Sequence, residues 1–187
     1  HNKRIQPTAS LAALASRRLM RVPLGGNLYT LQLRDKPMQE PTIQILGIYR
    51  VDLTDELIEE AMQVKYGGIN LSESEIRKAK EAVLEELSSV VLIDVLVSKP
   101  DEQFDLGDFG QPGSDQAAYD EVYLSPDGLS VISRYDPPIS DSFRLAFFLH
   151  FFDPTKPLKT SYGEIPLPPI RDMPEHYKAM IPYHPVD

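Results

Sequence analysis

The chain has 187 residues, of which 42% are hydrophobic and 25% are charged, a balance typical of a folded domain and unlike that of a disordered or fibrous chain. It contains no cysteine, which excludes disulfides, thiolate metal sites and a cysteine nucleophile. The formal net charge is −9, which disfavours nucleic-acid binding, and no apolar run is as long as the roughly 18 residues of a membrane span. We therefore expect neither nucleic acid nor a membrane as a partner.

The charge is divided unevenly along the chain. Residues 1–40 contain seven basic and two acidic residues, a net charge of +5, whereas the other 147 residues contain 12 basic and 26 acidic residues, a net charge of −14. Opposite charges attract each other at moderate salt. We therefore expect residues 1–40 to form a basic arm that docks on the acidic body of its own or a neighbouring chain. The alternative is a solvated tail.

Two elements are predicted in this arm. A helix is predicted to run from Thr8 or Ser10 to Met20, because either residue can cap it and apolar residues follow at helical spacing. A strand is predicted at residues 27–34, where apolar and polar side chains alternate. The apolar stretch of the helix is short, is interrupted by two arginines and is followed by no small-residue cleavage site, so it does not resemble a signal peptide. A cytoplasmic location is the default expectation.

The segment from Asn2 to about Met20 begins with the residues NKRIQPTA. This segment resembles the translated read-through of an integron recombination site, the kind of site that flanks mobile gene cassettes. The resemblance implies a bacterial, cassette-encoded protein, and it implies nothing about activity because it is a relic of the nucleotide sequence. We expect the native chain to begin at Met20 or Met38, which would make part of the arm non-native.

Residues 41–152 are predicted to form the core domain, and its first half is expected to contain one strand and two helices. The strand is expected at residues 42–51. The first helix is expected to begin after Asp52 or Thr54, because the acidic residues that follow suit its positive N-terminal end, and to end at a glycine pair.

The second helix has the clearest start signal in the chain. Ser72 and Glu75 have the spacing of a capping box, in which each side chain satisfies a backbone N–H of the other residue. Leu71 and Ile76 have the spacing of a hydrophobic staple across the same turn. The helix is predicted to run to about Leu87.

The second half of the core domain is predicted to consist of strands. The aliphatic run at residues 90–97 is typical of a buried strand. Residues 119–124 and 129–135 flank the turn at residues 125–128, which predicts a hairpin, and residues 143–152 form a last strand. Successive strands after a helix pair favour an α+β fold, with a mainly antiparallel sheet and two helices packed on one face.

Residues 153–187 are predicted to form a proline-rich strap, because they contain eight of the 17 prolines. Proline cannot donate a hydrogen bond to a strand ladder, so we expect the strap to stay outside the central sheet. Asp172 and Glu175 are predicted to cap a short helix that runs through Met180.

Signatures of known chemistry are missing. The chain has no phosphate-binding loop, no zinc-protease motif and no serine-hydrolase elbow, and we expect no cofactor. An acidic loop at residues 101–108 makes Asp101, Asp105 and Asp108 candidates for metal ligands. Their spacing does not fit a helix–loop–helix calcium site, so the main interpretation of the loop is a solvated acidic segment and no metal site is expected.

Two residues are candidates for acid–base catalysis. Asp94 interrupts the aliphatic run, where an ionised carboxylate must find a partner or its pKa rises. The alternative is that Asp94 is partly exposed, or pairs with Arg50, Arg134 or Arg144. His150 lies among aromatic residues of the last strand and is alternatively a core histidine. If Asp94 and His150 face each other in a pocket, they form an acid–base pair.

Aromatic residues are concentrated in the second half of the core domain. Ten of the sixteen aromatic residues fall between residues 104 and 152. Most are expected in the core, and the excess is suited to a ligand pocket or a subunit interface. The candidates for ligand contacts are Tyr119, Tyr123, Tyr135 and Phe148.

Taken as a whole, these patterns favour a non-catalytic binding or interaction protein that forms a homo-oligomer. A basic protein and a small molecule are the alternative partners. The alternative function is a small-molecule-binding enzyme that uses Asp94 and His150 as acid and base in an aromatic pocket. The two functions differ in whether Asp94, His150 and the tyrosines converge on one concave pocket.

Overall fold

The computed structural model describes residues 20–24, 27–31, 42–98, 109–113 and 118–186. Its contacts divide the chain into two units, residues 1–40 and residues 41–187, and each unit is described by itself.

The first unit contains an antiparallel pair of strands, β1 (Met20–Leu24) and β2 (Asn27–Leu31), in which Met20 lies opposite Leu31. Met20 was expected at the end of a helix and instead begins a strand. Val22 and Pro23 follow it and both disfavour helix, which explains the difference. The rest of the expected helix lies outside the described residues.

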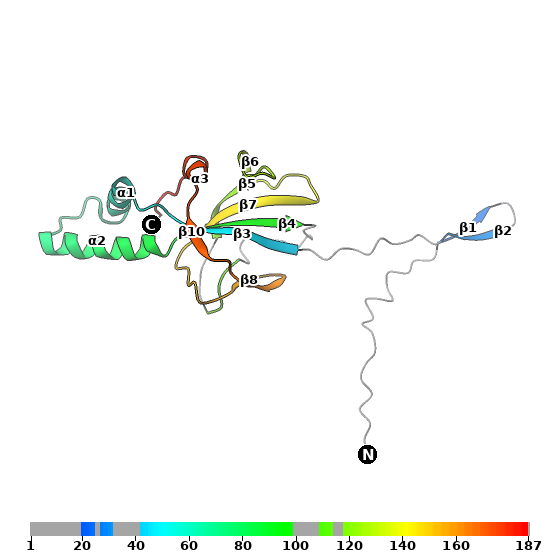
Figure 1. The fold of residues 1–187 in the computed structure, drawn as a ribbon, viewed down its shortest axis with the longest axis horizontal. Coiled ribbons are helices and arrows are strands. Elements are labelled where there is room, and N and C mark those ends of the chain that lie inside the picture. The colour runs from blue at the N-terminus through cyan, green and yellow to red at the C-terminus, as the bar shows by residue number, and fades with distance from the viewer. Residues whose placement is uncertain (1–19, 25–26, 32–41, 99–108, 114–117, 187) are drawn as a thin grey trace, which may run out of the picture. The chain divides into compact units, whose positions relative to one another are not determined.

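The second unit is built on a six-stranded sheet with the strand order β10-β3-β4-β7-β5-β6 (Figure 1). The strands are β3 (Thr42–Arg50), β4 (Val91–Ser98), β5 (Ala118–Leu124), β6 (Val131–Arg134), β7 (Ser142–Leu149) and β10 (Ile170–Asp172). All neighbours are antiparallel except β10, which runs parallel to β3. The predicted α+β class is confirmed, with a sheet that is mixed because of this one parallel pair.

The centre of the sheet is covered on both faces, which explains the aliphatic run in β4. Leu92 belongs to the core between the sheet and the helices, whereas Ile93 belongs to the core on the opposite face. Both side chains are fully buried. A strand with two buried faces has no need for polar alternation, so its sequence is apolar at nearly every position.

The described residues contain three helices, α1 (Asp55–Tyr66), α2 (Glu73–Ser88) and α3 (Glu175–Met180). Ala61, Val83 and Tyr177, one from each helix, pack in the same core as Leu92. The expected two helices on one face are therefore joined by α3 from the strap. Figure 1 shows α2 extending beyond the end of the sheet, and Ile76 near its start is accordingly exposed.

The helix starts follow local chemistry. The Thr54 hydroxyl accepts a hydrogen bond from the Leu57 N–H at 3.2 Å at the start of α1. At the start of α2, the Glu75 carboxylate accepts hydrogen bonds from the Ser72 N–H at 2.8 Å and from the Ser72 hydroxyl at 2.6 Å. These contacts satisfy polar groups that a helix end leaves without partners.

The strap, residues 153–187, contributes both to the core and to the sheet, which the sequence did not predict. Its hairpin, β8 (Leu158–Thr160) and β9 (Gly163–Ile165), contributes the fully buried Leu158 to the core opposite the helices. Contrary to the expectation that the strap stays outside the sheet, β10 joins it. It joins only at the edge, beside β3, where a proline-rich segment is tolerated. Pro174, rather than Asp172, occupies the cap of α3, because Asp172 ends β10.

No helix in the described part of the chain is long and apolar enough to cross a membrane.

The packing of α2 gives a stability prediction. Leu87 is 3% exposed in the core beneath the helices, whereas Leu129 in the β5–β6 turn is 63% exposed. We expect Leu87→Ala to lower the free energy of unfolding by about 2–5 kcal/mol, because it removes buried apolar atoms and leaves a cavity. The matched Leu129→Ala change should stay within about 0.5 kcal/mol. Urea denaturation of both variants measures the difference, and equal effects would contradict this packing.

Candidate functional site

Asp94 lies on β4 and is fully buried in an ion pair with Arg144 on β7. The Arg144 guanidinium donates hydrogen bonds to both carboxylate oxygens, from Nε at 3.0 Å and from Nη2 at 2.7 Å. The hydroxyl of Tyr177 on α3 donates a third hydrogen bond to the carboxylate at 2.6 Å, and Arg144 in turn donates to the Tyr177 hydroxyl at 2.8 Å. Of the three arginines considered as partners, Arg144 is therefore the one that pairs with Asp94.

One glycine leaves room for Arg144 of this cluster, and another leaves room for Tyr49, whose ring is next to that of Tyr177. Gly47 lies opposite Asp94 in the β3–β4 ladder, and a Cβ atom there would lie 2.3 Å from the Tyr49 hydroxyl. Gly128 has a φ of +72°, and a Cβ atom there would lie 2.6 Å from the Arg144 guanidinium carbon. Close approach of a neighbouring side chain explains the glycine at both positions.

The cluster around Asp94 links several elements of the fold and does not expose a reactive group. Arg144 also donates a hydrogen bond to the Pro126 carbonyl at 3.1 Å, so the pair joins β4, β7, α3 and the β5–β6 turn. Burial raises the pKa of the Tyr177 phenol, and its hydrogen bond to Asp94 raises this pKa further. The hydrogen bond to Asp94 likewise holds the pKa of Arg144 above its usual value. The Tyr177 phenol and the Arg144 guanidinium therefore both stay protonated near neutral pH.

His150 follows β7 and belongs to a second, separate cluster. Its Nε2 atom is hydrogen-bonded to the Tyr119 hydroxyl and lies 2.8 Å from the Tyr183 hydroxyl. Burial lowers the pKa of His150, with a smaller opposing effect from Glu86 on α2 and a smaller lowering effect from Lys65 on α1. Glu86 and Lys65 form an ion pair with each other. His150 is thus a half-buried histidine that favours its neutral form.

The structure does not bring Asp94 and His150 together. Asp94 lies opposite Ala146 of β7, and His150 comes four residues after Ala146 in the chain. At about 3.3 Å per residue, this places the two backbones roughly 13 Å apart. Each side chain has its own partners, and neither lines a described pocket that could hold a substrate. The geometry that an acid–base pair requires is therefore missing among the described residues.

A bulge in β5 separates two of the expected ligand contacts. Tyr119 lies opposite Phe148 and Val122 lies opposite Ala146, so β5 has one extra residue between these pairs. Asp120, within the bulge, has a φ of +52°. An extra residue reverses the alternation of side chains beyond it. Tyr119 therefore packs against the core beneath the helices, whereas Tyr123 is buried in the core on the opposite face.

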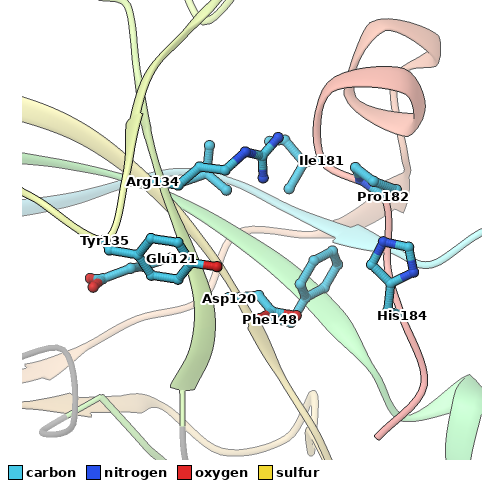
Figure 2. Close-up of a pocket in the computed structure, with 9 residues that line it drawn as sticks. Asp120, Glu121, Arg134, Tyr135, Phe148, Ile181, Pro182 and His184 are labelled. Atoms are coloured by element: carbon cyan, nitrogen blue, oxygen red, sulfur yellow. The ribbon is translucent and has the colours of Figure 1, made fainter.

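The same bulge borders a pocket of about 280 Å³ between β5, β6 and the segment after α3 (Figure 2). Of the four expected ligand contacts, Tyr135 and Phe148 line it. The other lining residues are Asp120, Glu121, Val122, Arg134, Ile181, Pro182 and His184. Figure 2 shows the hydroxyl of Tyr135 directed into the pocket and His184 at its side.

Backbone strain is concentrated around this pocket. Among the described residues, three non-glycine residues have a positive φ, namely Asp120, Tyr135 at 81° and Phe151 at 53°. Asp120 and Tyr135 line the pocket, and Phe151 follows His150 and explains why β7 ends at Leu149 instead of reaching Phe152 as expected. Such conformations cost about 1–3 kcal/mol each and gather at ligand and active sites.

The sequence offered little to identify this pocket. Arg134 was considered only as a partner for Asp94, and Asp120 and His184 were not singled out. Their grouping depends on the bulge and on the course of the segment after α3, neither of which has a local sequence signal.

The three candidates for metal ligands, Asp101, Asp105 and Asp108, lie outside the described residues. Within the described ranges, no group of three or more histidines, aspartates or glutamates is arranged to hold a metal ion.

The sequence matches no protein-family model, and comparison with curated proteins and with solved structures gives no match. Interpretation of the site therefore depends on its geometry and chemistry.

The buried ion pair gives a prediction about coupling. We expect Asp94→Leu alone to lower the free energy of unfolding by about 3–5 kcal/mol, because it leaves the Arg144 guanidinium without its buried partner. The double change Asp94→Leu with Arg144→Leu should cost clearly less than the two single changes added together. Urea denaturation of the four proteins measures this coupling. Additive effects would show that the two side chains do not depend on each other.

His150 gives a prediction about pH. Its folded-state pKa lies below the unfolded value of 6.5, so the unfolded chain takes up a proton first as the pH falls. The stability that neutral His150 contributes is complete above that value and is lost as the pH falls from about 6.5 through the lower folded pKa. Between about pH 7 and pH 5, the melting temperature should fall less in His150→Gln than in the unchanged protein.

Leu129→Ala, a change at an exposed side chain that does not titrate, supplies the control for this measurement and should keep the full pH dependence. A His150→Gln variant with an unchanged slope would show that another group is responsible.

Proposed function

We propose that this protein is a non-catalytic binding protein that forms homo-oligomers, with the β5–β6 hairpin and the loop after β6 at the contact between copies. The observation that carries the proposal is the exposure of large apolar side chains in this segment. Leu129 is 63% exposed, Ile132 54% and Tyr135 73%, and Ile139 is fully exposed. These four side chains lie within eleven residues of one another, and an exposed apolar patch is typical of a protein–protein contact site.

The position of this segment favours a second copy of the chain as the partner. β6 is the last strand at its side of the sheet, so its outer edge is free among the described residues. A two-fold axis near Ile132 places each exposed segment against the same segment of another copy, so that Leu129 of one copy lies near Tyr135 of the other. Such self-complementary contacts are the commonest way in which soluble proteins form dimers.

The shape of β6 indicates how the copies would meet. The strand has four residues, and Ile132 is unpaired in a bulge between the pairs formed by Val131 and Ser133. Short and bulged edges discourage the addition of another strand through the backbone. We therefore expect the contact to consist of side-chain packing rather than one continuous sheet.

The charge distribution supports association between copies. Residues 1–40 have a net charge of +5 and residues 41–187 a net charge of −14. Attraction between the basic segment of one copy and the acidic body of another opposes the repulsion between two acidic bodies. Because salt screens such forces, this contribution weakens at high ionic strength.

Binding has more support than catalysis. The two candidates for an acid–base pair are engaged in separate clusters, Asp94 with Arg144 and His150 with two tyrosines. The charged pocket beside β5 and β6 contains neither of them. A small molecule thus remains a suitable partner for this chain, whereas no pocket in the described residues brings the candidate acid and base together.

The mass of the full chain in solution tests the proposal. We expect the protein to form a dimer or a larger oligomer in sedimentation equilibrium. Ile132→Lys should weaken the association by about ten-fold or more, because it places a charge within an apolar contact.

Ile69→Lys is the matched control, since Ile69 is 58% exposed in the connection between α1 and α2, far along the chain from the proposed contact. It should leave the association unchanged. A protein that stays monomeric at high concentration, or an Ile132→Lys variant that associates like the unchanged protein, would rule out the proposed contact.

A further inference from the structure

The pocket between β5 and β6 contains opposite charges that do not pair with each other. Arg134 and Asp120 both line it, and neither has an ion-pair partner within 4.0 Å in the described part of the chain. The Arg134 guanidinium donates a hydrogen bond to the Met180 carbonyl at 2.9 Å. Figure 2 shows Arg134 and Asp120 on opposite sides of the pocket.

The strand register explains this separation. Arg134 lies opposite Val122, which is two residues beyond Asp120 in β5. The bulge lies between Tyr119 and Val122, so Asp120 is within it. Val122 belongs to the core beneath the helices, so Arg134 is placed toward the same face. The positive φ of Asp120 sets its direction independently of the ladder. The two charges therefore face one space without meeting across it.

The second acid of the pocket has a different role. The Glu121 carboxylate accepts a hydrogen bond from the Tyr123 hydroxyl at 3.1 Å, and Figure 2 shows it directed away from the pocket. Asp120 is therefore the carboxylate available to a ligand. His184 adds a second nitrogen-bearing side chain, and its Nδ1 atom lies 3.7 Å from a Glu60 carboxylate oxygen outside the pocket.

The remaining lining is apolar and aromatic. Phe148 and Ile181 are buried side chains that form part of the pocket wall, and Pro182 lies next to Ile181. The Tyr135 hydroxyl is directed inward from the opposite side. A volume of about 280 Å³ is just below the roughly 300–1,000 Å³ of most small-molecule sites, so the ligand is small.

We propose that this pocket binds a small zwitterion, an α-amino acid with an apolar side chain. The Arg134 guanidinium binds the carboxylate of the ligand, for which its planar pair of donors is suited. The Asp120 carboxylate binds the ammonium group, and the apolar side chain lies against the exposed Pro182 and the ring of Tyr135. A ligand with both charges satisfies both protein groups at once, which a simple anion or cation does not. The site is formed by residues of one copy, and it shares Tyr135 with the proposed contact between copies, so binding is measured by calorimetry and assembly by mass.

Calorimetric titration of the full chain with four probes tests the ligand class. L-Phenylalanine and L-leucine have both charges, 3-phenylpropionate lacks the ammonium group and phenethylamine lacks the carboxylate. We expect the two amino acids to bind, and each single-charge probe to bind about ten-fold more weakly than L-phenylalanine, because it loses one charged hydrogen-bonded contact.

Two substitutions assign the charges to their residues. Arg134→Gln should weaken the binding of L-phenylalanine and of 3-phenylpropionate, because both need the guanidinium. Asp120→Asn should weaken only L-phenylalanine, by about ten-fold, because 3-phenylpropionate has no ammonium group. Asparagine tolerates the left-handed backbone of position 120, so this variant keeps the local conformation. Circular dichroism checks that both variants are folded.

Arg171→Gln and Asp141→Asn are the matched controls, because both residues are exposed and neither lines the pocket. Both control variants should bind L-phenylalanine like the unchanged protein. The proposal is overturned if no amino acid binds at millimolar concentration, or if the single-charge probes bind as tightly as L-phenylalanine. It is also overturned if Asp120→Asn weakens L-phenylalanine and 3-phenylpropionate equally.

Discussion

The second unit of this protein depends on one buried carboxylate. Asp94 is in the middle of the sheet with no exposed surface, where an ionised carboxylate without partners would be very costly. It is stable there because Arg144, 50 residues later, and Tyr177, 83 residues later, both donate hydrogen bonds to it. The carboxylate thus ties β4 to its neighbour β7 and to α3.

This arrangement also decides where binding can occur. The groups around Asp94 satisfy one another, so they have no capacity for a ligand. On the same face, toward the β6 edge of the sheet, the bulge at Asp120 and the left-handed backbone at Tyr135 turn polar side chains into an open pocket. The strain of those two residues is compatible with folding because the rest of the sheet is so well packed. The cluster around Asp94 therefore stabilises the fold, whereas the polar groups of the pocket beside β5 and β6 are available to a ligand.

Local features of the fold could be predicted because their causes are local. Ser72 and Glu75 interact within one helical turn, and the turn ending at Gly128 joins two strands that are adjacent in sequence. The parallel pairing of β10 with β3 could not be predicted, because it joins segments more than 100 residues apart and β10 has only three residues. For the candidate site, Tyr135 and Phe148 were predicted, whereas Arg134 and Asp120 depend on a bulge that no local pattern announces.

The sequence by itself determined the α+β class, the starts of α1 and α2 and the presence of an acid within an aliphatic strand, because these follow from side-chain periodicity and short-range hydrogen bonds. The tertiary structure alone decided which arginine pairs with Asp94, that Asp94 and His150 lie in separate clusters, and that Tyr119 and Tyr123 lie on opposite faces. The physical reason is that one extra residue in a strand reverses every later side chain, and only the ladder with the neighbouring strand reveals it.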